Sequence, residues 1–100
     1  MQEEERAELA RQEGAELRVT SVSLLADGSV RLAGFDMGPA VEEFWGDEDY
    51  EFWVRVPTEA VARLGFLLLR EKYAGCADAV ARFREFCEQH KIAHEFDNWV

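Results

Sequence analysis

Residues that alternate between apolar and polar mark three segments of this chain as β-strands. The segments are residues 17–25, 29–35 and 50–56. In the first segment the apolar residues change from odd-numbered to even-numbered positions near residues 20–21. That change predicts either a bulge at this point or burial of both faces of the strand.

A tight turn joins the first two predicted strands. Asp27-Gly28 supplies the residue types that accept the positive φ values of a hairpin turn. Val30 and Leu32 then share one face of the second strand. In the third strand, Trp53 lies on the face opposite a row of four apolar residues, which are Tyr50, Phe52, Val54 and Val56.

Apolar residues that recur every three or four positions predict two helices after the strands. The first helix begins near Pro57 and Thr58 and ends by Gly75, and the second runs from about Asp78 to Lys91. The positions at which we expect these helices to form a nearly fully buried core are Leu64, Leu68, Phe83 and Phe86.

The two ends of the chain carry weaker patterns. Residues 1–14 are strongly charged and rich in good helix formers, which indicates a solvated helix or arm that ends at Gly14. At the other end, we expect residues 91–100 to form a closing strand or an extended tail, anchored by Ile92, Phe96 and Trp99.

These elements predict an α+β fold in the order β-β-β-α-α-β. A three-stranded antiparallel meander is followed by two helices packed on one face of the sheet and a C-terminal strand. We expect a single domain over residues 15–100, preceded by the charged segment 1–14.

Composition and charge narrow the classes of function. The formal net charge is −10, which repels nucleic-acid phosphates and anionic lipids and favours a basic protein partner. The longest aliphatic run, Phe66 to Leu69, is too short to span a bilayer. Because residues 2–5 are acidic and not basic, we expect no secretory signal, and two cysteines predict no disulfide framework. We therefore expect a cytoplasmic protein, monomeric or homodimeric, that binds neither nucleic acid nor membrane.

The stretch Val41–Val56 combines acidic and aromatic residues. No Lys or Arg lies between Arg31 and Arg55, so these carboxylates are not neutralised locally. The residues predicted to bind a partner are Glu42, Glu43, Trp45, Asp47, Glu48, Asp49, Glu51 and Trp53. Because aromatic side chains are usually core material, we also expect at least two of the three tryptophans to be mostly buried.

Part of this stretch resembles a family of small uncharacterised bacterial proteins. The similarity lies in the motif D-x-G-x-x-V-E-E-F-W-G, here residues 36–46, followed by the acidic–aromatic residues 49–51. The tail Ile92–Phe96 is similar to the closing strand of that family. The resemblance implies an α+β fold and carries no activity.

Metal and catalytic chemistry are less well supported by the sequence. Asp47, Asp49 and Glu51 alternate as calcium ligands do, but the glycine and distal glutamate of an EF-hand loop are missing. The spacing C-x-x-H-x-x-x-H at Cys87, His90 and His94 is a zinc spacing only on one continuous helix. We therefore predict no metal site, no cofactor and no catalytic residue.

The sequence thus favours a protein-binding module over an enzyme. The favoured hypothesis is an immunity or inhibitor type of protein that binds a basic partner through its acidic–aromatic surface. Two alternatives stay open. One is a homo-oligomeric structural protein, and the other is a small metal-dependent hydrolase that uses the acidic cluster, with Glu42 and Glu43 as an acid–base pair.

Overall fold

A computed structural model of the chain describes residues 2–39, 42–43, 46 and 49–99. The chain divides into two compact units, Met1–Gly65 and Phe66–Val100. The expectation that the helices cover one face of the sheet concerns both units and stays a prediction.

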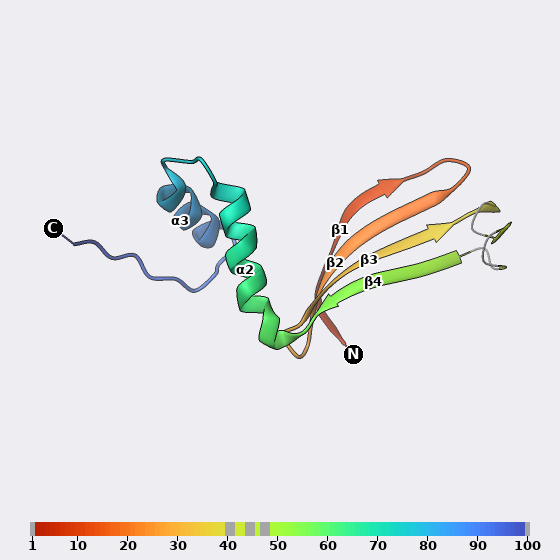
Figure 1. Cartoon of the computed structure of the whole chain (residues 1–100), viewed down its shortest axis with the longest axis horizontal. Helices are drawn as coiled ribbons and strands as arrows, with labels where there is room; N and C mark the ends of the chain where they lie inside the picture. The colour runs from red at the N-terminus through yellow and green to blue at the C-terminus, as the bar shows by residue number, and fades with distance from the viewer. Residues whose placement is uncertain (1, 40–41, 44–45, 47–48, 100) are drawn as a thin grey trace. The chain divides into compact units, whose positions relative to one another are not determined.

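The first unit is built on a four-stranded antiparallel sheet. Its strands are β1 (Glu3–Gln12), β2 (Leu17–Leu25), β3 (Val30–Met37) and β4 (Asp49–Val56). They lie side by side in chain order (Figure 1), so each strand pairs with the next one along the chain. The predicted α+β class and the predicted three-stranded meander are therefore confirmed, with one further strand at the N-terminal edge.

The predicted hairpin between β2 and β3 is present. Gly28 adopts φ +86°, and its N–H donates to the carbonyl of Leu25 at 2.9 Å. The Leu25 N–H in turn donates to the carbonyl of Ser29 at 2.9 Å. This positive φ is strained for residues other than glycine, which explains Gly28 at this point of the turn.

The prediction of a helix or solvated arm over residues 1–14 is wrong, because residues 3–12 form strand β1. β1 pairs antiparallel with β2, with register shifts between Glu3 and Glu5 and between Glu8 and Ala10. The second shift lies opposite residues 20–21, where the apolar pattern of β2 changes phase. Local helix propensity is a weak preference, and hydrogen bonding to a neighbouring strand overrides it.

The strand register separates two faces of the sheet. On the polar face lie the odd-numbered residues of β2, β3 and β4, among them Ser21, Ser23 and Arg31; on the apolar face lie the even-numbered ones, among them Val22 and Leu32. On the polar face of β2, four side chains are nearly inaccessible, which are Val19, Ser21, Ser23 and Leu25. The apolar face is more open, since Leu32 and Val54 are both exposed.

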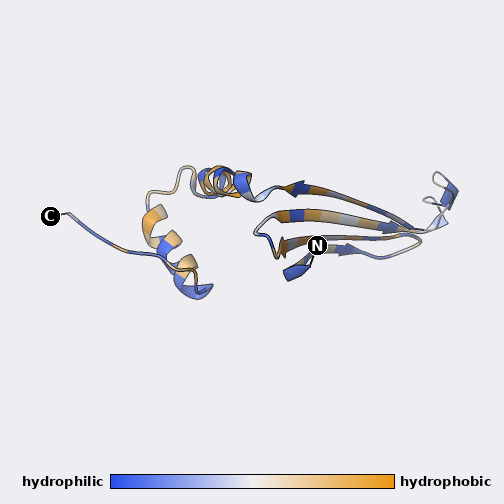
Figure 2. Ribbon diagram, turned by 90° about the horizontal axis from the view of Figure 1, so that it is seen from below, coloured by the Kyte–Doolittle hydropathy of each residue, from blue (hydrophilic) through white to orange (hydrophobic). Residues whose placement is uncertain are grey.

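Two helices follow the sheet, as predicted. They are α2 (Thr58–Tyr73) and α3 (Ala79–Gln89), and both show hydrophobic segments along the ribbon (Figure 2). Tyr73 and Phe83 meet edge to face, with 6.0 Å between ring centroids. Cys87 is the buried residue of α3.

The prediction of a nearly fully buried core in the helices is wrong. Leu68 is 55% exposed and Phe83 is 38% exposed, and neither Leu64 nor Phe86 is fully buried. The apolar period placed the helices correctly. The same period does not predict which apolar side chains pack against another element of the structure.

The predicted C-terminal strand is also wrong. Residues 92–99 form neither strand nor helix, and the ring of Phe96 instead lies against the guanidinium of Arg84, 4.2 Å from Cζ to the ring centroid. No helix within the described ranges is long and apolar enough to cross a membrane.

Candidate functional site

Strand β4 carries the acidic and aromatic residues in a regular alternation. Asp49, Glu51 and Trp53 are two residues apart and therefore project from the polar face. We call these three residues the acidic–aromatic row. The apolar face of the same strand holds four residues that alternate with them, which are Tyr50, Phe52, Val54 and Val56. The face assignments predicted from the sequence are thus confirmed.

The row is open to solvent. Every residue of β4 from Asp49 to Arg55 is exposed, and the Trp53 side chain remains 59% exposed. Trp99, near the C-terminus, is also exposed. The expectation that at least two of the three tryptophans are mostly buried is therefore wrong.

Five further residues were predicted to join this surface. Glu42 and Glu43 are exposed and helical. Trp45, Asp47 and Glu48 lie outside the described residues. The part of the predicted site that the structure brings together is therefore the acidic–aromatic row itself.

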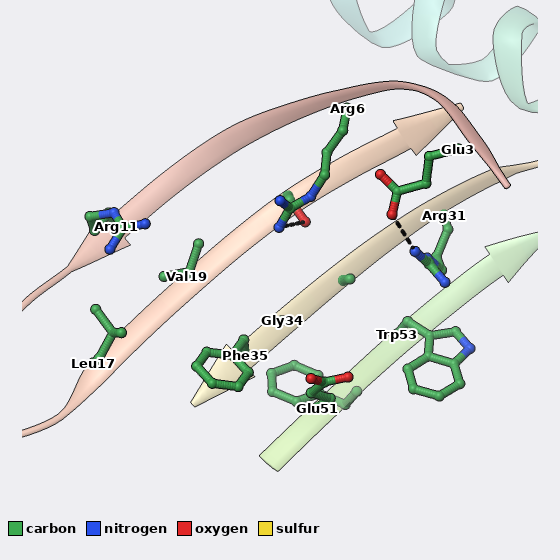
Figure 3. Close-up of a pocket in the computed structure, with 13 residues that line it drawn as sticks. Glu3, Arg6, Arg11, Leu17, Val19, Arg31, Gly34, Phe35, Glu51 and Trp53 are labelled. Atoms are coloured by element: carbon green, nitrogen blue, oxygen red, sulfur yellow. Dashed lines mark hydrogen bonds and ion pairs between the residues drawn. The ribbon is translucent and has the colours of Figure 1, made fainter. Parts of the chain in front are cut away.

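Beside the row the polar face forms an open hollow of about 490 Å³. Figure 3 shows Glu51 and Trp53 on the β4 wall of this hollow, with Arg6 on β1 and Arg31 on β3. Sequence reasoning missed the arginines, because their positions follow only once residues 3–12 are known to be a strand. The sequence feature that could have indicated this strand, and with it the arginines, is Gly14, which lies between two segments that can pair as a hairpin.

The arginines of the hollow already have acceptors. Arg31 donates to Glu3 at 3.0 Å, and Arg6 donates to the Ser21 hydroxyl at 3.4 Å. Arg11 donates to Glu8 at 2.8 Å, and this hydrogen bond, with the negative charge of Glu8, raises the pKa of the Arg11 guanidinium. The hollow is therefore not a strongly cationic site for an anion.

Asp27 fixes the C-terminal end of β4 to the β2–β3 turn. Its carboxylate accepts hydrogen bonds from the N–H and hydroxyl of Ser29 and from Arg55, the last at 2.9 Å. The hydroxyl of Thr58, the first residue of α2, donates to the Asp27 carbonyl at 2.7 Å. Because Asp27 balances the charge of Arg55, the exposed row N-terminal to Arg55 keeps its acidic character.

The residues weighed for metal binding do not converge. Cys87 is buried, the imidazole of His90 lies against the Phe86 ring, and His94 Nδ1 is 2.7 Å from the Ile92 carbonyl. Across the described parts of the chain, no three His, Cys, Asp or Glu side chains come together in a way that could hold a metal ion. The described residues that line the hollow include no histidine or cysteine, so they supply no nucleophile–base pair of the usual kind.

No family model matches the chain, and neither a curated protein nor a solved structure matches it.

Proposed function

We propose that this chain is a protein-binding module of the immunity or inhibitor type, which binds a basic partner protein through the acidic–aromatic row. The observation that carries the proposal is the exposure of Trp53 next to Glu51 on one face of β4. A largely exposed indole is unfavourable in water and is a frequent anchor at protein interfaces. The neighbouring carboxylates favour a partner with basic residues around the indole site.

The charge of the whole molecule supports the same kind of partner. A net charge of −10 accelerates the encounter with a basic protein and disfavours nucleic acid. Both cysteines are free thiols, which supports a place in the reducing cytoplasm. The resemblance of residues 36–46 to small bacterial proteins supports a bacterial source.

Affinity capture from the native host tests the proposal when wild-type and variant baits are compared. We expect a basic protein to bind the wild type and to be lost from the Trp53→Ala bait. A Glu59→Gln bait is the matched control, because Glu59 is an exposed carboxylate on α2, outside the row. Equal capture by the Trp53→Ala and wild-type baits would contradict the proposal.

Kinetics with the purified partner then separate the two parts of the row. Glu51→Gln should slow association and reduce the effect of raising NaCl from about 0.05 M to about 0.3 M. Trp53→Ala should mainly increase the dissociation rate, by roughly tenfold or more. Glu59→Gln should change neither rate. A salt-independent association rate for the wild type would show that the carboxylates do not guide the partner.

A further inference from the structure

The two outer strands of the sheet differ in how their edges are protected. β1 is dense in charged residues and its pairing with β2 is interrupted by two register shifts. β4 pairs with β3 without a shift and contains three aromatic residues, no lysine and no proline. Charges and bulges are the usual means of preventing a further strand from pairing, so β1 is a guarded edge and β4 is a pairing-competent one.

The register shows which backbone groups of β4 point away from β3. Because the Leu25 N–H bonds to the Ser29 carbonyl next to the turn, the odd-numbered residues of β2 and β3 form the hydrogen-bonded pairs. The even-numbered residues of β3 therefore bond to the even-numbered residues of β4. The outward N–H and C=O groups of β4 belong to Asp49, Glu51, Trp53 and Arg55. Among the described residues, β3 is the only strand paired with β4.

We propose that two copies of this chain form a symmetric dimer by antiparallel pairing of their β4 strands about a two-fold axis at Phe52. In this register Asp49 lies opposite Arg55 of the second copy, and Glu51 lies opposite Trp53 of the second copy. All four residues with outward backbone groups are then hydrogen-bonded. The interface is self-complementary, as a two-fold axis requires.

The two neighbouring registers of the β4–β4 pair are less favourable, because each creates a charge repulsion or loses a backbone hydrogen bond. An axis at Glu51 places two Glu51 carboxylates opposite each other, and like charges in that position are destabilising. An axis at Trp53 places Asp49 opposite Pro57, which has no N–H to donate. The axis at Phe52 avoids both and forms two Asp49–Arg55 contacts. Arg55 can keep its bond to Asp27, because a guanidinium has five N–H donors.

The dimer also enlarges the candidate binding surface. The two acidic–aromatic rows become neighbours across the axis on one face of a continuous sheet, and the partner copy contributes Trp53 beside each Glu51. On the other face the two Phe52 rings come into register. This inference concerns the same strand as the proposed function but does not require a basic partner, since dimerisation is measured on the chain alone.

Sedimentation of charge-swapped chains tests the pairing directly. The wild-type chain should dimerise between about 1 and 100 µM at about 0.15 M salt. Asp49→Arg alone and Arg55→Asp alone each place like charges at both contacts, so each should weaken the dimer by about tenfold or more. An equal mixture of the two variants restores both opposite-charge contacts and should dimerise as tightly as the wild type. Glu59→Arg, outside β4, is the control and should leave the dimer unchanged.

If Arg55→Asp does not fold, a second variant that removes a backbone N–H from the outer edge of β4 still tests the pairing. In Glu51→Pro the lost N–H points away from β3, so the sheet can form while the outer edge cannot pair fully. We expect this variant to be folded by circular dichroism and monomeric. The inference is overturned by a wild type that is monomeric throughout, by unweakened single variants or by a mixture no tighter than its components. A monomeric wild type that still captures a basic protein would overturn the dimer and leave the proposed function standing.

Discussion

Ser21 and Ser23 occupy successive polar-face positions of β2 and are both nearly inaccessible, yet their hydroxyls differ. The Ser21 hydroxyl accepts a hydrogen bond from Arg6, whereas the Ser23 hydroxyl has no hydrogen-bond partner within the described structure. A buried hydroxyl without a partner opposes folding, since it loses its bonds to water. This difference makes the two serines a matched pair for mutation.

Ser23→Ala should raise the free energy of unfolding by about 1 kcal/mol, because it removes an unsatisfied buried oxygen at little cost in packing. Ser21→Ala should leave that free energy unchanged or lower it by about 0.5–1 kcal/mol, since Arg6 loses an acceptor. Urea unfolding of the three chains checks both signs. A loss of stability in Ser23→Ala as large as in Ser21→Ala would show that the Ser23 hydroxyl is satisfied in solution.

Asp27 gives the stability of the first unit a defined dependence on pH. Hydrogen bonds from Ser29, and then the contact with Arg55, lower the pKa of the Asp27 carboxyl in the folded state. A lowered folded-state pKa adds stability above the unfolded value of about 3.9, and this stability is lost as the pH falls through the folded pKa. The window in which the contribution disappears therefore lies below about pH 4.

Comparison of wild type with Asp27→Asn isolates this contribution from the other carboxyl groups. Between about pH 5 and pH 2.5 the wild type should lose more stability than Asp27→Asn, because the variant has no proton to take up at this position. Urea unfolding across that range provides the measurement. Identical pH profiles for the two proteins would contradict the role assigned to Asp27.

At the scale of the elements, Gly34 shows how β3 and β4 fit together. Gly34 lies opposite Phe52 in the register, and a Cβ at this position would overlap the Phe52 ring. The ring therefore covers the glycine on the apolar face and also stacks on Tyr50, with 5.3 Å between centroids. An absent side chain on one strand makes room for an aromatic ring on the next.

Gly34→Ala should lower the free energy of unfolding by about 1–3 kcal/mol, because the Phe52 ring must leave its position. Gly65→Ala in α2 is the matched control, since nothing lies within 4 Å of the added Cβ. It should raise stability by about 0.5–1 kcal/mol through helix propensity. Thermal unfolding followed by circular dichroism measures both. A neutral Gly34→Ala variant would mean that Phe52 does not cover the glycine in solution.

Local chemistry allowed the central elements to be predicted from the sequence. Asp27-Gly28 specifies its turn through the φ angle of Gly28, and the alternation from Tyr50 to Val56 specifies a strand and its faces. Residues 3–12 could not be predicted in the same way, because their strand depends on pairing with β2 and their composition favours a helix. The C-terminal strand was predicted but is absent from residues 92–99. Its prediction rested on Ile92, Phe96 and Trp99, and apolar residues alone do not provide a neighbouring strand to pair with.

The candidate site was predictable to a similar degree. The alternation along β4 places Trp53 on the same face as Glu51, but its exposure does not follow from that placement, because Val54 on the opposite face is exposed as well. The hollow beside Trp53 requires Arg6 on β1 and Arg31 on β3 to flank β2 from its two sides, which no pattern within one segment reveals. The sequence of one strand does not specify the register in which it pairs with a distant strand, and that register places Arg6 and Arg31 at the hollow.

For the molecule as a whole, the excess of acid should make stability depend on ionic strength. A net charge of −10 produces self-repulsion in the folded state, and several ion pairs, Arg11–Glu8, Arg82–Asp78 and Arg84–Glu88, are largely exposed and contribute little. Raising NaCl from about 0.05 M to about 0.5 M should therefore raise the Tm by a few degrees. A fall in Tm would show that ion pairs outweigh the repulsion.

We infer that β4 is the recognition element of this molecule, through its outward backbone and its acidic–aromatic row. Residue-resolved amide hydrogen exchange tests it most directly. In dilute protein, Phe52 and Val54 should exchange slowly, since their N–H groups face β3, while Glu51 and Trp53 should exchange fast. On raising the protein concentration, Glu51 and Trp53 should become protected while Phe52 and Val54 change little. Equal protection of all four amides in dilute protein, or exchange at Glu51 and Trp53 that never slows, would contradict the account.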